Sequence, residues 1–589
     1  MRNTFRQLTL ASGIPSLALA VFAAGFALIS AFRLRWTCDD AFISFRYAKN
    51  LTEGLGLVFN AGEVVEGYTN FLWTILMALG IFLKLDPRVF AEGLGLVFYA
   101  GVLYLLYAFG RRLNEKGGGG ARVLVFFPLA LAGYALIRHA RIYASGGLET
   151  SLFTFLILLG TYLVYLRAHA NRSLFPGAPF LVFALAAMTR PDGLLFYATA
   201  GLYLLMRRDG PGSLGGRGES LVVRARKILL EHWPLLVVFL PYFLWRYSYY
   251  GYVFPNTYYA KSGGASHFAQ GWKYFTLFFN AYYVFYFLPP LLIAYAIRKA
   301  REGRRAFFKG SDPFVFFLLL PTAVAGILYY VKVGGGFMFG RFFMPFLPFL
   351  FLTMEYATLR LFRPRLALAA TLIVMFAAMA YNDPYRGRPL PARHGISDES
   401  KIYRPRDLSF LSAKVRSWSR AFRESGAKIA FGGSQAFYAY YLNVPTAIEA
   451  ASGLTDAYLA HRPLPKRGAI MGHEKSAPLS YLKRRGVHIH LHPGALPGRR
   501  PYNVMKVAGL PGEWRVITYR SSVMNRLAQV PDFQFRRFES YLDDYIARLH
   551  SIPREKVRRD YAEFRAYYFR WNRDESRERK ILKRMREVR

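Results

Sequence analysis

The stretch WTCDDAFISFRYAKN, residues 36–50, places two adjacent carboxylates, Asp39 and Asp40, directly after the first long apolar run of the chain. A carboxylate can act as a general base that takes the proton of an attacking hydroxyl. The pair could instead cap the helix expected to follow, because a helix start favours negative charge. We expect Asp39 to be the catalytic carboxylate and Asp40 its supporting partner. No cofactor is certain, and a divalent cation at Asp39 and Asp40 is left open.

Basic residues also stand in the loops that the topology below assigns to the outer face. Positive charge there runs against the positive-inside rule, so we expect it to bind a ligand. Arginine and lysine hold phosphate through charge-assisted hydrogen bonds, which predicts an anionic lipid leaving group. The expected donor phosphate ligands are Arg138, Arg141, Arg190, Lys261 and Arg341, with Arg341 and at least one other arginine in direct contact.

The same loops carry further polar and aromatic side chains that we expect to bind the sugar or the acceptor. They are Glu66, Tyr68, Asn70, Glu149, Asp192, Asn256, Tyr258, Asp456, His473 and Glu474. Simpler interpretations stay open: aromatic residues collect at membrane interfaces, TRPDG can be a plain turn, and 473–475 can be a solvated loop. For His488, His490 and His492 we favour an exposed strand face over a metal site, because no acidic or cysteine partner stands at ligand spacing.

Eleven apolar stretches are candidates for the elements that position these residues, since a span needs roughly 20 apolar residues. They are 14–32, 91–110, 122–137, 148–166, 178–189, 192–206, 228–247, 274–297, 313–331, 342–361 and 365–381. Arg2 and Arg6 place the N-terminus inside, and the basic loop at 111–122 should also be inside. An odd number of crossings must therefore separate that loop from Asp39, so we expect 71–83 to lie along the outer interface without crossing.

The fold class expected is a polytopic α-helical membrane protein with about eleven spans and a C-terminal extracytoplasmic α/β domain. We divide the chain into 1–381, the membrane part, 382–530, the outer domain, and 531–589, a basic helical tail. Residues 1–32 could pass for a signal peptide, but we expect a retained first span. The net charge of +42 lies largely in loops between spans, so we expect no nucleic-acid partner. A single cysteine, Cys38, excludes an intramolecular disulfide.

Several of these stretches together resemble a known family. DDAFISFRYAKNLTEGLGLVFNAGEVVEGYTNFLWT, SGGLETSLFT, TRPDG, YYGYVFPNTYYAK and GLTDAYLA followed by GHEK occur in this order. They are similar to the terminal β-1,2-arabinofuranosyltransferases of mycobacterial cell-wall synthesis and to their ZomB-type relatives. The resemblance reaches to about residue 492.

The resemblance implies a GT-C glycosyltransferase in the bacterial inner membrane, with its active site on the outer face. It implies a polyprenyl-phosphate sugar donor, a cell-envelope glycan acceptor and a catalytic acidic pair at Asp39 and Asp40. Similar proteins often have Asp within GGDFM, where this chain has Gly336, so we expect the sugar contact there to differ.

Two other functions compete with the enzyme. A transporter or flippase for lipid-linked glycans should place ionisable residues midway along its spans, which are almost free of charge here. A non-catalytic envelope or flagellar assembly protein should tolerate loss of the acidic pair.

Overall fold

The structure is a computed structural model. It describes the chain except residues 1, 116–125, 170–174, 208–220, 262–263, 304–306, 309, 404, 434, 465–467, 469, 492–497, 511 and 587–589, and except the side chains of 2–15, 115, 221, 224, 405 and 406. Most of the basic loop at 111–122, most of the inner loop around 207–227, and His492 therefore lie outside the described residues.

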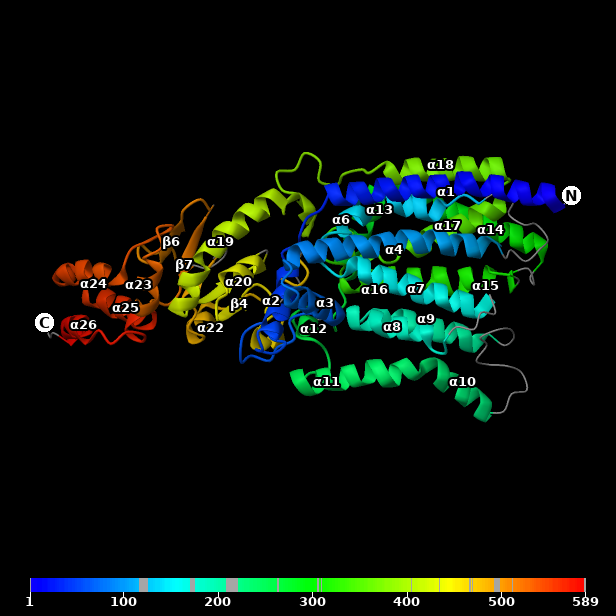
Figure 1. The fold of residues 1–589 in the computed structure, drawn as a ribbon. Coiled ribbons are helices and arrows are strands. Elements are labelled where there is room, and N and C mark those ends of the chain that lie inside the picture. Colours follow the sequence, from blue (N-terminus) through cyan, green and yellow to red (C-terminus); the bar gives the residue numbers. More distant parts are fainter. Residues whose placement is uncertain are drawn as a thin grey trace.

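The N-terminal two thirds of the chain form a bundle of helices that run roughly side by side (Figure 1). Its helices are α1 (Arg2–Arg33), α4 (Pro87–Glu115), α5 (Leu129–Leu136), α7 (Thr150–His169), α8 (Ala178–Thr189), α9 (Gly193–Met206), α10 (Leu221–Pro234), η1 (Leu235–Phe239), α11 (Leu240–Tyr250), α13 (Phe268–Ala281), η2 (Tyr283–Phe287), α14 (Leu288–Glu302), α15 (Asp312–Phe314), η4 (Val315–Leu319), α16 (Leu320–Val333), α17 (Leu347–Leu361) and α18 (Pro364–Met379). Every predicted apolar stretch coincides with one of these helices or with a continuous pair.

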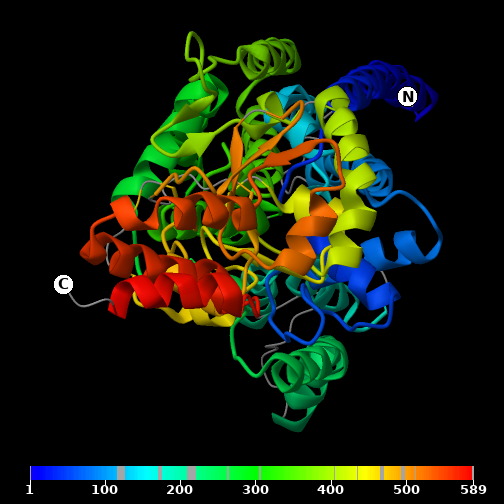
Figure 2. The ribbon, with the colours of Figure 1, turned by 90° about the vertical axis from the view of Figure 1, so that its left-hand side faces the viewer.

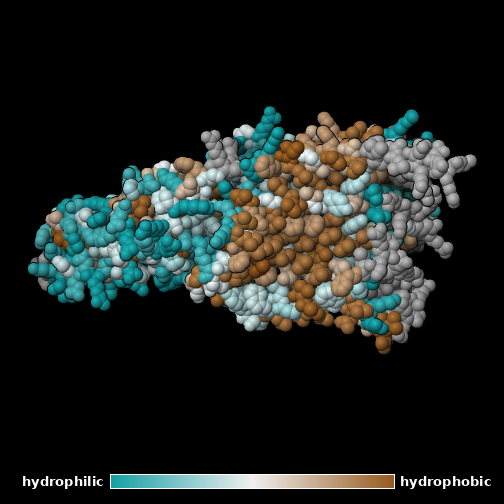
Figure 3. Space-filling view, viewed as in Figure 1, coloured by the Kyte–Doolittle hydropathy of each residue, from teal (hydrophilic) through white to brown (hydrophobic). Residues whose placement is uncertain are grey.

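Five helical segments of the described residues are long and apolar enough to cross a membrane. They are Ser16–Arg33, Pro87–Asn114, Thr150–His169, Ala225–Tyr250 and Asp312–Val333. The surface over this half of the molecule is hydrophobic, whereas the C-terminal half is hydrophilic (Figure 3). The protein is thus a helical membrane protein, and the count of eleven spans stays a prediction.

The segment at 71–83 forms the short helix α3 (Phe71–Phe82), which follows α2 (Ala41–Thr52). Twelve residues at 1.5 Å per residue reach about 18 Å, well short of a bilayer core of about 30 Å. Both helices lie at the end of the bundle that faces the C-terminal domain (Figure 1). This placement agrees with the expected interfacial helix, so α1 and α4 run in opposite directions along the bundle.

The C-terminal domain contains one six-stranded mixed sheet with the order β4-β3-β5-β7-β6-β8. Its strands are β3 (Lys428–Phe431), β4 (Thr446–Glu449), β5 (Ile489–His490), β6 (Val504–Val507), β7 (Glu513–Val516) and β8 (Phe533–Phe535). Strand β3 is parallel to β4 and β5, and the remaining pairings are antiparallel. Around it lie α19 (Pro405–Ser425), α20 (Ala436–Leu442), α21 (Ala457–His461), α22 (Leu479–Arg484), α23 (Ser521–Leu527), α24 (Phe538–Ala547), α25 (Arg554–Phe564) and α26 (Glu575–Arg586). The strand and helix alternation expected from the sequence is present.

Two expectations for this domain need correction. The boundary at 530/531 falls inside the sheet domain, because β8 pairs with β6 and the hydroxyl of Tyr567 donates to the backbone oxygen of Tyr502 at 3.1 Å. The strand around His488 and His490 is not exposed: both side chains are buried, and the Nδ1 of His488 accepts from the backbone N–H of Lys428 at 2.9 Å. The pattern of alternating histidines therefore marks a buried central strand.

The outer loops of the bundle and the C-terminal domain are joined by polar side chains that complete each other's backbone. Arg46 on α2 donates to the backbone oxygens of Ala439 and Val444, the latter at 2.7 Å. Asn60 accepts from the N–H of Ala447 at 2.9 Å and donates to the oxygen of the same residue at 3.0 Å. These contacts fix the domain over the end of the bundle that carries Asp39 and Asp40 (Figures 1 and 2).

This arrangement predicts the accessibility of the turn that follows α3. In a Cys38→Ser background, Lys84→Cys should react with a membrane-impermeant maleimide in intact cells, because α3 stays on the side of the C-terminal domain. The matched control is Gly303→Cys, at the opposite end of α14, which should react only after permeabilisation. If Lys84→Cys also needs permeabilisation, α3 crosses the membrane.

Candidate functional site

The two adjacent aspartates that open the sequence argument point to different places. Asp39 is buried, and its two carboxylate oxygens accept the backbone N–H groups of Ala436 at 2.7 Å and Phe437 at 3.0 Å. Burial raises the pKa of Asp39 to about 8, although these two hydrogen bonds lower it. Asp39 therefore caps α20, an element of the other domain.

Asp40 instead lines a cavity at the end of the bundle. It is the first residue before α2, but its side chain makes no capping hydrogen bond to that helix. Because adjacent residues at a helix start project in different directions, only one of the pair reaches the cavity. The simple capping interpretation thus describes Asp39, with a different helix from the one expected, and leaves Asp40 free for chemistry.

The cavity has a volume of about 340 Å³ and combines charged with aromatic walls. It is lined by Asp40, Thr69, Arg190, Pro191, Asp192, Phe254, Pro255, Thr257, Tyr258, Lys261, Ala265, Tyr329, Tyr330, Val333, Gly335, Gly336, Phe337, Met338, Arg341, Phe342 and Met471. Three of the five predicted phosphate ligands, Arg190, Lys261 and Arg341, therefore share one cavity with Asp40.

Glu149, just before α7, holds the two arginines in place from behind. Its Oε1 accepts from Arg190 at 3.1 Å and from Arg341 at 2.8 Å, and its Oε2 accepts from the amide of Asn70 at 3.1 Å. Burial opposes ionisation of Glu149, but Arg341 and Arg190 more than compensate and lower its pKa. One buried carboxylate facing two guanidinium groups leaves a net positive charge for the cavity.

Arg190 makes a second set of contacts within the TRPDG turn. Its Nε donates to Asp192 at 3.1 Å, and it also donates to the hydroxyl of Tyr330, which in turn donates to Asp192 at 2.6 Å. The turn is therefore more than a connection between α8 and α9, because its arginine and aspartate both face the cavity.

Lys261 follows α12 (Asn256–Ala260), and its side chain is open to the cavity. Burial lowers the pKa of its ammonium, the charge of Asp40 opposes this effect, and Arg341 and Arg190 add to it. A bound anion would relieve this crowding of positive charges, which is what a phosphate subsite requires.

Two of the predicted phosphate ligands lie elsewhere. Arg141, on α6 (Arg138–Tyr143), donates to the hydroxyl of Ser30 at 2.7 Å and to the backbone oxygen of Leu136 at 3.2 Å. Arg138 stands on the same short helix and does not line the cavity. Arg141 is wrong as a phosphate ligand in this structure because it is committed to binding α1.

Several residues predicted to bind sugar or acceptor hold the outer loops together instead. Glu66 pairs with Arg246 at 2.9 Å, and burial raises its pKa to about 7 although Arg246 opposes this. Tyr68 shares a hydrogen bond of 3.1 Å with the hydroxyl of Tyr250. Asn70 serves Glu149 as described above. Of the remaining residues of the bundle loops, Asp192 and Tyr258 line the cavity.

The other predicted acceptor ligands join the two domains. Asn256 donates to the backbone oxygens of Gly453 and Leu454 at 2.9 and 2.8 Å. Asp456 accepts from the N–H of Leu459 at 3.0 Å and pairs with Arg485 at 2.9 Å, so it is a cap. Glu474 accepts from the N–H of Gly468 at 2.7 Å.

His473 lies behind the cavity wall, with its ring edge-on to Phe337 at 5.1 Å between centroids. Its neighbour Met471 belongs to the cavity lining. The segment around GHEK therefore brings the C-terminal domain to the site, but through Met471 and not through a charged side chain.

The glycine-rich loop before Arg341 is shaped by close packing. A Cβ at Gly336 would lie 2.4 Å from the ring of Phe342, and one at Gly335, where φ is +69°, would lie 2.4 Å from Tyr274. Phe342 stacks on Tyr330 at 4.6 Å between centroids. The ring of Phe342 thus occupies the space that a side chain at position 336 would need.

Sequence reasoning missed several cavity residues, among them Thr69, Tyr329, Tyr330 and Met338. Tyr329 and Tyr330 end an apolar helix, where tyrosine is common at a membrane interface and gives no separate signal. Thr69 stood within the quoted loop GEVVEGYTNF but was not singled out.

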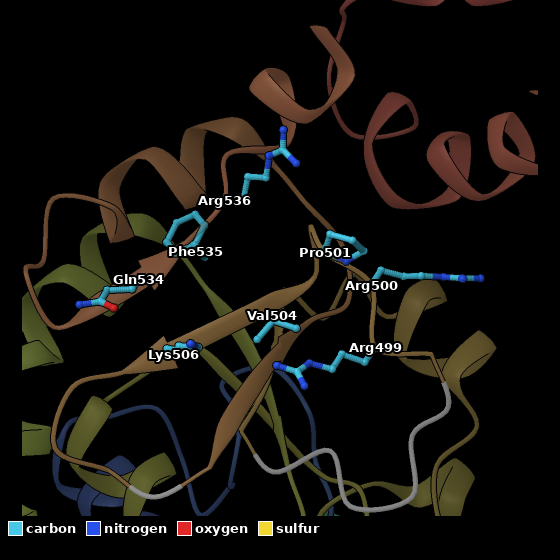
Figure 4. A pocket seen from close by; sticks show the side chains of 8 residues that line it. All are labelled: Arg499, Arg500, Pro501, Val504, Lys506, Gln534, Phe535 and Arg536. Atoms are coloured by element: carbon cyan, nitrogen blue, oxygen red, sulfur yellow. The ribbon is translucent and has the colours of Figure 1, made fainter. Parts of the chain in front are cut away.

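A second hollow, of about 450 Å³, lies on the sheet domain and is lined by Arg499, Arg500, Pro501, Val504, Lys506, Gln534, Phe535 and Arg536 (Figure 4). It is larger than the cavity at the bundle end, but no carboxylate lines it. Two of its arginines are paired, Arg499 with Glu513 at 2.8 Å and Arg500 with Glu563 at 3.4 Å. It therefore lacks the general base and the unbalanced buried charge that distinguish the first cavity.

The acidic pair does not suit a shared divalent cation. Both oxygens of Asp39 are occupied by backbone N–H groups, so Asp39 cannot join Asp40 as a second ligand. Among the described residues no group of three or more His, Cys, Asp or Glu side chains is placed to hold a metal ion.

Comparison with known proteins confirms the resemblance drawn from the motifs. No family model matches the chain. It is 31% identical over 349 residues to the terminal β-(1→2)-arabinofuranosyltransferase of Corynebacterium glutamicum, covering 55% of this chain and 48% of the relative. It is 30% identical over 329 residues to the enzyme of the same name from Mycobacterium tuberculosis, covering 52% and 50%. The chain thus spans about half the length of the curated relatives it matches.

Two crystal structures of ArnT from Cupriavidus metallidurans align with most of the chain. The apo structure covers 85% of this chain and 97% of its own, at 15% identity and a TM-score of 0.47. The structure bound to undecaprenyl phosphate covers 91% and 95%, at 14% identity and a TM-score of 0.38. At these scores the functional argument rests on the protein's own geometry.

The division of labour between the aspartates predicts a difference in stability. Asp39→Ala removes both acceptors from the start of α20, and loss of a helix cap costs about 0.5–2 kcal/mol. Asp40→Ala removes a side chain that faces the cavity and should change the free energy of unfolding by less than about 0.5 kcal/mol. Thermal denaturation of the two purified proteins in the same detergent measures this. A larger loss for Asp40→Ala would show that Asp40 carries the structural role.

Proposed function

We propose that the protein is a GT-C glycosyltransferase that moves a sugar from a polyprenyl-phosphate donor to a glycan outside the inner membrane. The observation that carries this proposal is the single cavity in which Asp40 meets Arg190, Lys261 and Arg341 at the end of an apolar bundle. The arabinofuranosyltransferase relatives support the reaction class.

The three cations form the subsite for the donor phosphate. Arg190 and Arg341 are held by Glu149 with fixed geometry, whereas Lys261 brings a charge with no comparably short ion pair among those described. Charged hydrogen bonds to phosphate are stronger than neutral ones and stabilise the phosphate as it leaves. The charge that develops on the leaving group is thus met by groups already in place.

Asp40 is the general base, so the roles expected for the two aspartates are exchanged. A hydroxyl of the acceptor attacks the anomeric carbon, its proton passes to Asp40, and the bond from that carbon to the phosphate oxygen breaks. The electron pair of that bond leaves with the polyprenyl phosphate. Asp40 suits this step because it lines the cavity and makes no capping bond.

The side wall of the cavity suits a lipid-linked donor. Phe254 and Tyr329 are about half exposed, at 47% and 51%, and Tyr258 stacks on Phe254 at 4.4 Å between ring centroids. The neighbouring span Ala225–Tyr250 is only 11% buried and stands apart from the bundle in both ribbon views. A polyprenyl chain can therefore lie against apolar surface while its phosphate reaches the cations.

The names of the relatives make arabinofuranose the first sugar to test. Asp192, Thr69 and Thr257 are the polar groups beside Asp40 that are suited to hydroxyl contacts. Gly336 offers no carboxylate, and Phe342 fills that position, so the sugar contacts here differ from those expected of GGDFM-containing proteins. The acceptor approaches from the side of the C-terminal domain, which contributes Met471 to the wall.

A transporter is the main competing function, and the buried Glu355 on α17 is the observation that could favour it. An ionisable residue within a membrane bundle is often functional. Here its carboxylate accepts the N–H of Ala130 at 2.9 Å and the amide of Asn114 at 3.2 Å. These contacts cap the start of α5 near the cytoplasmic end, so Glu355 is better explained as structural.

The general-base assignment predicts the effect of Asp40→Asn on turnover. Loss of a general base typically slows a reaction roughly 10²–10⁴-fold. We expect Asp40→Asn to abolish detectable sugar transfer from decaprenyl-phosphoryl arabinofuranose while binding the donor normally. Glu53→Gln, a change on the exposed end of α2, is the matched control. Turnover within a few fold of wild type for Asp40→Asn would remove Asp40 from the reaction.

The phosphate subsite predicts a change in donor affinity. Lys261→Gln should weaken binding of a polyprenyl phosphate about 10- to 100-fold, since a hydrogen bond to a charged group contributes about 1.5–3 kcal/mol. The control is Lys273→Gln, an exposed lysine on α13 outside the cavity. Equal affinities for the two variants would contradict the subsite.

A further inference from the structure

Glu399 is a buried carboxylate near Asp40 that neither the sequence motifs nor the proposed reaction uses. It lies in the strap that joins α18 to the C-terminal domain, in η6 (Glu399–Lys401), and is 5% exposed. Its Oε2 accepts from the thiol of Cys38 at 3.4 Å. Cys38 is buried and precedes the aspartate pair, so the strap contacts the segment that carries Asp40.

The strap also pairs with the wall of the cavity. The N–H of Phe339 donates to the backbone oxygen of Ser397 at 2.9 Å, and the N–H of Ser397 donates to the oxygen of Phe337 at 2.7 Å. Phe337 and Met338 line the cavity, and Arg341 follows in the same loop. Glu399 therefore sits between the loop of Asp40 and the loop of Arg341.

We propose that Glu399 is a positioning residue, which as an uncharged, hydrogen-bonded carboxyl keeps Asp40 and Arg341 in place and leaves the cavity positive for the donor phosphate. This inference rests on the proposed function for its ligand. It adds a residue from the inter-domain strap to the site and makes the C-terminal domain a part of it.

The electrostatic surroundings of Glu399 support the uncharged form. Burial raises its pKa to about 8; the charges of Asp40 and Asp39 add to this, while the Cys38 hydrogen bond and Arg341 oppose it. The other groups near it are Tyr143 on α6, and Asp398 and Lys401 on the strap itself. Asp398 faces His139 at 3.5 Å, and its pKa is lowered to about 2, so it stays ionised.

The sign of the pH effect follows from a raised carboxyl pKa. Below pH 8 Glu399 is neutral, and above it the carboxyl becomes charged and offsets one of the cavity's cations. Phosphate affinity should then fall as the pH rises through 8 to 9.5. A phosphate monoester is already dianionic there, since its second pKa is about 6, so the ligand itself does not change.

The first test measures binding of a polyprenyl phosphate to the purified full-length protein between pH 7 and 9.5. Wild type should lose roughly tenfold in affinity, the scale expected for one added charge near a binding site. Glu399→Gln, which stays uncharged at every pH, should lose about threefold or less. Asp39→Asn is the matched control because Asp39 titrates near the same pH, and it should keep most of the wild-type fall.

The second test needs neither a variant nor activity. Infrared difference spectra of wild type between pH 6.5 and 9.5 should lose the C=O stretch of a protonated carboxyl that shifts on ¹³C-glutamate labelling. A missing glutamate band, or an unchanged pH dependence in folded Glu399→Gln, would overturn the proposal. If both tests succeed but no sugar is transferred from any donor, the proposed reaction fails while the role of Glu399 at an anion site stands.

Discussion

The site depends on the balance of charge around Glu149. A buried guanidinium is stable only with a partner, and a single carboxylate here serves two of them, with Asn70 on its remaining oxygen. Four segments meet at this point: the α2–α3 loop, the start of α7, the TRPDG turn and the loop of Arg341. Since none of these segments contacts all the others through its backbone, Glu149 sets their relative positions. The excess positive charge that results is what an anionic donor can use.

The second organising feature is the exchange of backbone partners between the bundle loops and the C-terminal domain. Asp39, Arg46 and Asn60 each satisfy backbone groups of the sheet domain, and Asn256 does so from a separate loop. Buried backbone groups without a partner are costly, so the domain cannot shift over the bundle without losing these bonds. Met471 and the strap of Glu399 are delivered to the cavity by the same arrangement.

Local patterns predicted the helices well because an apolar run long enough to span leaves few alternatives. The parity of the charged loops also placed α3 on the correct side, and charge on the unexpected face led to Arg190, Lys261 and Arg341. Side-chain direction was beyond such reasoning. Arg141 shares the loop but turns to Ser30, and Asp39 serves a helix that is remote in sequence. Glu399 carried no local signal at all, since only the fold brings its strap to Cys38.

The packing of Phe342 against the bare backbone of Gly336 has a consequence for how such a site can diverge. A carboxylate introduced at 336 alone meets an aromatic ring that is itself stacked on Tyr330, and a smaller residue at 342 alone leaves a void beside Arg190. Each single change is unfavourable, whereas the two together restore the packing. Positions 336 and 342 therefore form an epistatic pair, and the order in which a lineage acquires the two substitutions decides whether the change of sugar is reachable.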